Sequence, residues 1–192
     1  MKIILLRHGD RFNSPLFETP LTQKGFEQAD KIATDLSSLN ITEIYCSPFL
    51  RTIQTIYPYC FKNKMEINIE NALYECTLGS DFNESNIRHH YSEHLKNFSM
   101  FKDIINKNYI SFCNINEINK KNTLSSIKSR VFEFLKKIVN RDKNVGEVFY
   151  KDQNILLVTH QYICNFIKQI FNLNVKHDNH FPMGSFEIFE IN

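Results

Sequence analysis

Two short apolar runs, each leading to a histidine, constrain the fold of this chain most strongly. Residues 2–6 (KIILL) are followed by Arg7 and His8, and residues 154–158 (NILLV) lead through one threonine to His160. Strands that are apolar on both faces are typical of a sheet covered by helices. Because ligands of an open parallel sheet bind outside the carboxyl ends of its strands, we expect both histidines to share one crevice. A histidine beside an arginine suits an anionic group there, and phosphate is the obvious candidate.

The rest of the chain alternates between strand-like and helix-like segments. The pattern predicts strands at 2–7, 43–46, 66–69, 154–159 and, at a sheet edge, 185–191, with helices at 22–38, 47–57, 123–140 and 160–171. This order predicts an α/β fold, a three-layer α/β/α domain with a mostly parallel central sheet. We expect residues 1–192 to form a single domain, in which 79–122 is a variable, partly helical insertion that rims the crevice. Helical spacing places Phe26 and Leu124 on the inner faces of their helices.

Capping residues give more detail at the ends of two helices. Thr22 is expected to cap the helix that follows it. Ser47 is expected as a second N-cap, with Pro48 at the first helical position, which places Arg51 in the first turn. The residue before a proline avoids the helical conformation, so this second helix is expected to end before Pro58.

Composition excludes several classes of protein. The chain has 192 residues, of which 42% are hydrophobic and 23% charged, as in ordinary globular proteins. A net charge of +2 is too small to indicate a nucleic-acid or membrane partner. The five cysteines form no CxxC pair, which favours free thiols in a reducing compartment. The first apolar run is too short for a signal peptide and no segment reaches the length of a membrane span, so a cytoplasmic protein is predicted.

A series of short strings resembles one known family. LLRHGDRFN, TPLTQKGFEQA, IYCSPFLRTIQT, LYE and VTH occur in this order and cover most of the chain outside the insertion. In this combination they resemble the histidine phosphatase superfamily, also called the phosphoglycerate mutase-like family. RHG alone is a weak motif, whereas the full series is specific. The acidic residue and arginine after RHG resemble the protein-phosphatase branch related to the suppressors of T-cell receptor signalling.

The resemblance implies a role for each matching residue. His8 would be the nucleophile that accepts the phosphoryl group and becomes a phosphohistidine. Arg7, Arg51 and His160 would bind the phosphoryl oxygens. Glu75, in the LYE string, would be the proton donor to the leaving group.

Two of these assignments remain open within the sequence. Either Asn13 or Ser14 would add a hydrogen bond to the phosphoryl group, because the alignment is uncertain there by one residue. Glu70 and Glu84 are rivals of Glu75 for the role of proton donor.

Physical chemistry supports the same residue types independently. Phosphoryl transfer depends on positioning and on charge stabilisation at the equatorial oxygens, which arginine forks supply. A neutral imidazole is a usable nucleophile near neutral pH, and an alkoxide leaving group needs a general acid. No carboxylate cluster with metal-ligand spacing is visible, so neither a metal nor a cofactor is expected. His90 and His94 have helical i, i+4 spacing, but without a third ligand they are interpreted as surface residues.

Departures from the family pattern leave three functions to compare. Gln161 follows the late histidine, where the family usually has glycine or alanine, and would crowd the pocket floor or add a polar contact. The ERxYG-type string of the mutases is missing after Glu75. The leading prediction is a metal-independent phosphatase of a small phosphorylated metabolite or a phosphoprotein. The alternatives are a cofactor-dependent phosphoglycerate mutase and a non-catalytic module that binds phosphorylated ligands.

Overall fold

The structure is a computed structural model. It describes residues 1–14, 16–76, 98–115, 118, 123–140, 153–171 and 179–191. Glu84, His90 and His94 lie outside the described residues, as does much of the predicted insertion at 79–122.

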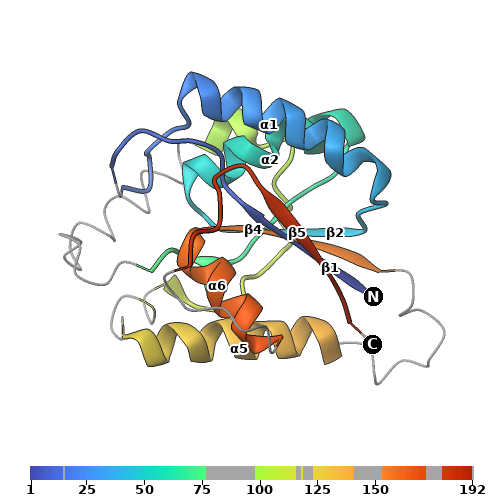
Figure 1. Ribbon diagram of the computed structural model, residues 1–192. Coiled ribbons are helices and arrows are strands. Elements are labelled where there is room, and N and C mark those ends of the chain that lie inside the picture. The colour runs from blue at the N-terminus through green and yellow to red at the C-terminus, as the bar shows by residue number, and fades with distance from the viewer. Residues whose placement is uncertain are drawn as a thin grey trace.

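A five-stranded sheet forms the middle of three layers (Figure 1). In spatial order its strands are β3 (Asn68–Ile69), β2 (Glu43–Cys46), β4 (Asn154–Thr159), β1 (Lys2–Arg7) and β5 (Phe186–Glu190). The first four are mutually parallel, and β5 is an antiparallel edge strand beside β1. The predicted α/β fold with a mostly parallel sheet and an edge strand near the C-terminus is therefore confirmed.

Helices cover both faces of the sheet (Figure 1). On one face lie α1 (Gln23–Asp35) and α2 (Leu50–Asn63), and on the other lie α5 (Leu124–Asn140) and α6 (Gln161–Ile170). Three short 3₁₀ helices complete the described elements: η1 (Leu36–Ser38), η2 (Asn71–Leu73) and η3 (Phe98–Phe101).

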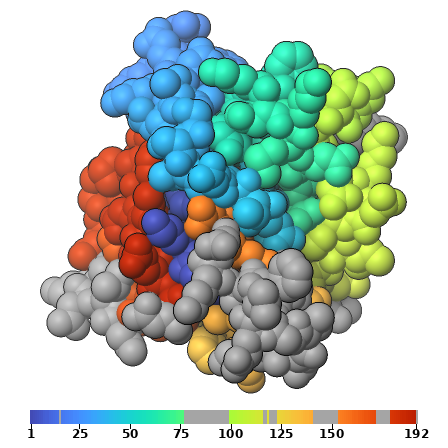
Figure 2. All heavy atoms as spheres, turned by 90° about the vertical axis from the view of Figure 1, so that its right-hand side faces the viewer, coloured from blue at the N-terminus to red at the C-terminus, as the bar shows by residue number. Residues whose placement is uncertain are grey.

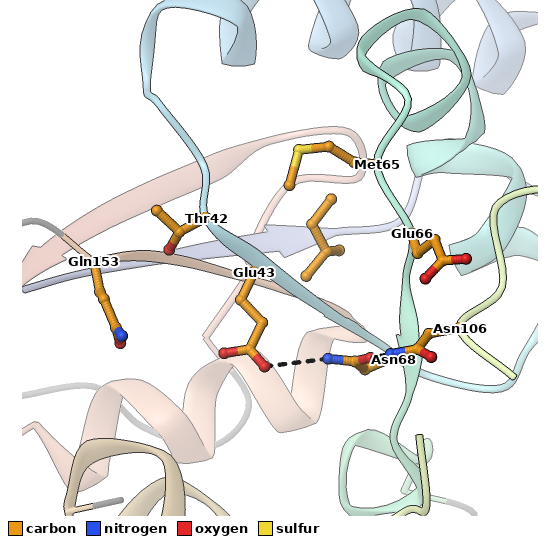
Figure 3. Close-up of a pocket in the computed structure, with 8 residues that line it drawn as sticks. Thr42, Glu43, Met65, Glu66, Asn68, Asn106 and Gln153 are labelled. Atoms are coloured by element: carbon orange, nitrogen blue, oxygen red, sulfur yellow. Dashed lines mark hydrogen bonds between the residues drawn. The ribbon is translucent and has the colours of Figure 1, made fainter. Parts of the chain in front are cut away.

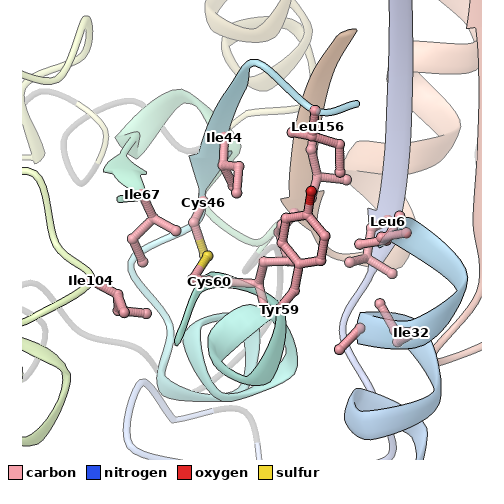
Figure 4. Packing of buried hydrophobic residues seen from close by; sticks show 14 of the residues in the cluster. Leu6, Ile32, Ile44, Cys46, Tyr59, Cys60, Ile67, Ile104 and Leu156 are labelled. Carbon is pink, nitrogen blue, oxygen red and sulfur yellow. The ribbon is translucent and has the colours of Figure 1, made fainter. Parts of the chain in front are cut away.

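The central strands are apolar on both faces because each face contacts a helical layer. Ile4 and Leu6 of β1 belong to the core cluster under α1 and α2, whereas Ile3 and Leu5 belong to the cluster under α5 and α6. This is the period of two that a strand imposes on its side chains. Figure 4 shows the first cluster, which includes Leu6, Ile32, Ile44, Cys46, Tyr59, Cys60, Ile67, Ile104 and Leu156.

The start of α1 agrees with the sequence, but two inner-face predictions are wrong. Thr22 is the N-cap, and its side chain accepts a hydrogen bond from the Gly25 N–H at 3.2 Å.

Phe26 and Leu124 are 41% and 43% exposed, although helical spacing places them inward. Both lie in the first turn of their helices, α1 and α5.

The start of α2 differs from the prediction. Ser47 is not the N-cap, because the helix begins at Leu50 with Phe49 in the capping position. The Ser47 hydroxyl instead lies 2.8 Å from Nε2 of His160, a residue more than a hundred positions away. Arg51 still falls in the first turn, as expected.

The end of α2 also differs, because the helix continues through Pro58 to Asn63. A proline inside a helix costs about 3 kcal/mol through the lost hydrogen bond and steric conflict. Here Tyr59 and Cys60, directly after the proline, are buried in the core under α2. Burial of an apolar side chain contributes about 1.5–3 kcal/mol, so these two side chains offset the cost.

The segment 98–115 joins the core beside α2. Phe101 and Ile104 are buried there, and Ile67 forms a parallel bridge with Ile105 instead of extending β3. The third strand is accordingly shorter than predicted. Figure 2 shows this segment, in yellow-green, against the green-cyan residues of α2. This described part of the predicted insertion is structural, and the predicted rim at the remaining residues stays a prediction.

The cysteines and helices bear on where the protein resides. All five cysteines are free, and Cys46, Cys60 and Cys164 are buried. Among the described helices, none combines the length and apolarity that a membrane span requires. The cytoplasmic location stays a prediction.

We expect Gly25→Ala to destabilise the protein, although alanine normally favours a helix over glycine by about 1 kcal/mol. A Cβ at Gly25 would lie 2.0 Å from the carbonyl oxygen of Asp10, in the loop after β1. Overpacking of this kind costs about 1–3 kcal/mol. The free energy of unfolding in urea should therefore fall by about 1 kcal/mol or more. Ser125→Ala, at an exposed position of α5, is the control and should leave stability unchanged or slightly higher.

Candidate active site

Three parallel strands bring four predicted site residues to one edge of the sheet. Strand β4 lies between β1 and β2, so the ends of all three are neighbours. The His8 N–H donates to the Thr159 carbonyl at 3.0 Å, and the Ser47 N–H donates to the Val158 carbonyl at 2.9 Å. Arg7 is paired in register with Thr159, the residue before His160. The crevice predicted at the carboxyl ends of the strands is therefore the place where these side chains meet.

His8 is held as a neutral imidazole with one free ring nitrogen. It is 1% exposed, and its Nδ1 lies 2.8 Å from the Gly9 carbonyl oxygen. A carbonyl only accepts, so Nδ1 carries the proton and Nε2 keeps its lone pair. Burial, and then the positive charge of Arg51, lowers the pKa of His8 well below its usual value of 6.5. His8 is thus unprotonated at neutral pH.

His160 lies edge-on to His8, with ring centroids 5.2 Å apart. Its Nε2 is 2.8 Å from the Ser47 hydroxyl, and the Phe49 ring packs against it at 4.8 Å. Its Nδ1 is 3.3 Å from Oε2 of Glu75, without the geometry of a hydrogen bond. Burial and the Arg51 charge lower the pKa of His160 well below the ordinary range.

Arg51 is a buried guanidinium beside a carboxylate. The residue is 1% exposed, Nη1 donates to the Leu16 carbonyl at 3.0 Å, and Nη2 lies 3.7 Å from Glu75 Oε2. The guanidinium carbon also lies 4.3 Å from the centre of the Phe49 ring. Burial lowers the pKa of Arg51 to about 9, against the opposing effect of Glu75. The group therefore stays charged at neutral pH.

Arg7 presents a second fork from the end of β1. Its Nη1 donates to Gln161 Oε1 at 2.8 Å and to the Phe181 carbonyl. Burial lowers its pKa. Among the described residues, Nε of Arg7 and Nε of Arg51 are both buried without a hydrogen-bond partner. Buried donors are nearly always paired in native proteins, so two unpaired guanidinium donors in one crevice indicate an anionic ligand.

Glu75 is carried to the crevice by the turn after η2. The Thr159 hydroxyl donates to the Leu73 carbonyl at 2.8 Å, and Arg130 donates to the carbonyl of Tyr74. The Cys76 N–H donates to Glu75 Oε1 at 2.9 Å. Burial raises the pKa of Glu75, mainly opposed by the charge of Arg51. A raised pKa suits a carboxyl group that donates a proton.

Glu70, the rival of Glu75, lies among structural contacts instead. It is fully buried, and its carboxylate accepts four hydrogen bonds. The donors are the N–H groups of Ala72 and Phe112 and the hydroxyls of Tyr109 and Ser111. These bonds fasten the segment 98–115 to η2, the turn that carries Glu75.

The loop after His8 does not bring its two candidates to this cluster. Asn13 is exposed, and the Ser14 hydroxyl accepts a hydrogen bond from the Leu16 N–H at 3.4 Å. Arg11 holds the loop instead, because its Nη1 donates to the carbonyls of Phe12 and Ser14, each at 2.7 Å. The hydrogen bond predicted from Asn13 or Ser14 to a phosphoryl group stays a prediction.

Three residues to which the resemblance gives no role also contribute to the site. The Arg11 charge lowers the pKa of both His8 and His160, although it is the least of the causes for each. Ser47 contacts His160, and Gln161 contacts Arg7. The sequence held a signal for each, because Arg11 and Ser47 stand inside the matched strings and a polar contact was one of the two expectations for Gln161.

The donor set can also be compared with that of a metal site. One ligand atom each from His8, Glu75 and His160 lies within 4.8 Å of the others, which is compact enough for a metal ion. Arg7 and Arg51 oppose this, since two like unit charges about 4 Å apart repel by about 4 kcal/mol at an effective dielectric of 20. The cluster therefore fits an anion better than a divalent cation. Metal independence stays a prediction.

A separate hollow of about 390 Å³ lies beside the amino-terminal half of β2 (Figure 3). Its lining includes Glu43 and Glu66, and Asn68 donates to Glu43 Oε1 at 3.3 Å. Carboxylates in its lining repel an anion. This hollow therefore suits phosphate less well than the cluster of Arg7, His8, Arg51 and His160 at the carboxyl ends of the strands.

The protein thus has an α/β fold in which two histidines and two arginines gather at the carboxyl ends of its parallel strands. The family model of the histidine phosphatase superfamily (branch 1) matches residues 3–192. The chain belongs to this superfamily. No curated protein matches the chain in sequence.

Solved structures of several phosphatases share the fold. A putative alpha-ribazole-5'-P phosphatase from Escherichia coli is 22% identical, with a TM-score of 0.65 over 100% of this chain and 91% of that chain. The ecdysone phosphate phosphatase from Bombix mori, in complex with tungstate, is 15% identical, with a TM-score of 0.64 over 95% and 83%. A phosphoserine phosphatase mutant from Entamoeba histolytica, in complex with phosphoserine, is 17% identical, with a TM-score of 0.62 over 100% and 91%.

The buried neutral histidines make stability depend on pH. His8 has a folded-state pKa far below its unfolded value of about 6.5, so below pH 6.5 the unfolded chain binds a proton that the folded protein does not. The free energy of unfolding therefore decreases as the pH falls below 6.5, because protonation of His8 favours the unfolded chain. Between pH 7.5 and 5.5, we expect the free energy of unfolding to decrease by up to about 1.4 kcal/mol more in the wild type than in His8→Gln. Urea denaturation at both pH values measures this, and equal slopes would contradict a neutral His8.

Proposed function

We propose that this protein is a metal-independent phosphatase that hydrolyses phosphomonoesters through a phosphohistidine at His8. The observation that carries the proposal is the pairing of a neutral, buried His8 with two guanidinium groups whose Nε donors are buried and unpaired. A nucleophile with a free lone pair and charged donors for equatorial oxygens are what phosphoryl transfer requires.

The first step transfers the phosphoryl group to the protein. Nε2 of His8 attacks phosphorus, the ester P–O bond breaks, and an N–P bond forms. Arg7, Arg51 and His160 stabilise the charge on the equatorial oxygens. Glu75 gives its proton to the leaving oxygen, so the alcohol departs neutral.

The second step restores the enzyme. Water attacks the phosphohistidine, Glu75 as carboxylate takes the proton from the water, and the N–P bond breaks to release inorganic phosphate. The raised pKa of Glu75 supports the first role, and its place beside His160 and Arg51 supports the second.

The solved relatives support phosphatase activity without naming a substrate. Their names cite alpha-ribazole phosphate, ecdysone phosphate and phosphoserine, which share little besides a phosphate ester. For this chain we propose the same reaction on a small phosphorylated metabolite or a phosphoprotein. Turnover of 3-phosphoglycerate to its isomer, with no release of phosphate, would instead indicate a mutase.

The covalent intermediate is the most direct test. Wild-type protein mixed with ³²P-labelled phosphomonoester and quenched should retain label that is stable in alkali and labile in acid. His8→Ala should retain none, because alanine offers no nucleophile. Label that persists in His8→Ala would remove His8 from the mechanism.

A control separates loss of chemistry from loss of fold. The surface variant His180→Ala should keep the full label, since His180 is exposed in the structure. The circular dichroism spectrum of His8→Ala should match that of the wild type.

The leaving group tests Glu75. Glu75→Gln should lose much of its activity on alkyl phosphates and keep a larger share on p-nitrophenyl phosphate, because nitrophenolate hardly needs a proton. In the wild-type pH profile, the acidic limb should come from His8 and lie below pH 6.5, since its pKa is lowered. The basic limb should come from Glu75 and disappear in Glu75→Gln.

Glu133→Gln, on the exposed face of α5, is the matched control and should treat both substrates as the wild type does. Equal losses on the two substrates in Glu75→Gln would mean that Glu75 only orders its turn.

A further inference from the structure

Arg7 is held in place by one side chain and one carbonyl. Gln161 is the first residue of α6, and its Oε1 accepts a hydrogen bond from Nη1 of Arg7 at 2.8 Å. The Phe181 carbonyl, in the segment before β5, accepts from the same nitrogen. Because Arg7 is paired in register with Thr159, Gln161 lies only two residues beyond its strand partner.

The geometry at the start of α6 explains how the contact forms. Helical side chains point back toward the amino end of their helix, so a long side chain at the first position reaches over the strand end. The side chain of Gln161 is long enough to bring its amide oxygen to the guanidinium of Arg7. Glycine and alanine have no side-chain atom that reaches Arg7. The contact therefore depends on Gln161, the residue in which this chain departs from the family pattern.

Both acceptors occupy the same nitrogen of Arg7. Nη1 is therefore turned toward Gln161 and Phe181, while Nε stays buried and unpaired. Nε and Nη2 form the edge of the guanidinium that binds two oxygens of a phosphate. Both acceptors are also neutral, so they orient the guanidinium without cancelling its charge.

We infer that Gln161 is a positioning residue that orients Arg7 and thereby sets the affinity of the crevice for the phosphoryl group. The inference rests on the proposed function. Gln161 would affect phosphoryl affinity through Arg7, without itself touching the reacting atoms.

Direct binding of inorganic phosphate and vanadate tests the inference without turnover. Isothermal titration calorimetry on Gln161→Ala should show phosphate binding weakened about tenfold, which corresponds to about 1.4 kcal/mol. Gln161→Met keeps the length of the side chain and removes the acceptor, so it should show a similar loss. Steady-state assays should show the same fold-change in the inhibition constant of phosphate.

Gln161→Glu tests whether the side chain at position 161 lies against Arg7, the contact that the structure shows. It retains the acceptor but places a carboxylate beside Arg7, so phosphate binding at pH 8 should be weaker than in Gln161→Ala. Binding should recover as the pH falls and the new carboxylate takes up a proton. A side chain at position 161 that lies away from Arg7 would produce no such pH dependence relative to the wild type, and that outcome would overturn the inference.

Gln23→Ala is the matched control, because Gln23 is also the first residue of a helix, α1, and is exposed. It should bind phosphate as the wild type does. Phosphate binding within twofold of the wild type in both Gln161→Ala and Gln161→Met would overturn the inference and leave the proposed function intact. A wild-type protein that binds neither phosphate nor vanadate would overturn both.

Discussion

The parallel pairing of β4 between β1 and β2 is the constraint on which the rest of this structure depends. Two backbone hydrogen bonds at its end, from His8 to Thr159 and from Ser47 to Val158, align three chain segments that are far apart in sequence. The apolar residues of these strands contact helices on both faces, so the strands cannot shift by one residue without moving their side chains to the wrong layer. The same register that packs the core therefore sets the spacing of His8 and His160.

The pairing of these strands buries the titratable groups at their carboxyl ends, and this burial shifts the pKa values of those groups. Burial, and then the charge of Arg51, lowers the pKa of the two imidazoles, and burial raises the pKa of Glu75 against the effect of Arg51. A cluster with this balance has an excess of positive charge and unpaired donors. Such a balance favours an anion over a cation, which supports the proposed phosphoryl site.

Structural contacts around the crevice show how distant segments support it. Glu70 binds the segment 98–115 to η2, Thr159 fastens η2 to β4, and together they carry Glu75 to His160. Gln161 and Arg11 orient groups at the crevice without standing in the most recognisable motif positions. The site is therefore held by polar contacts between elements, and its most deeply buried groups are charged or titratable.

The sequence by itself determined the strand and helix order, the parallel sheet and the grouping of Arg7, His8, Arg51 and His160, because periodicity and strand ends are local signals. It could not determine what Ser47 does, since the local capping signal is outweighed by a contact with His160 that exists only in the folded chain. The continuation of α2 through Pro58 was likewise decided by burial of the residues after the proline. The sequence could not separate Glu70 from Glu75, because two similar carboxylates five residues apart differ only in the groups that surround them; the tertiary structure places Glu75 beside His160 and Arg51 and Glu70 among hydrogen-bond donors. Local patterns reveal which residues are candidates, whereas burial and long-range partners decide how each one is used.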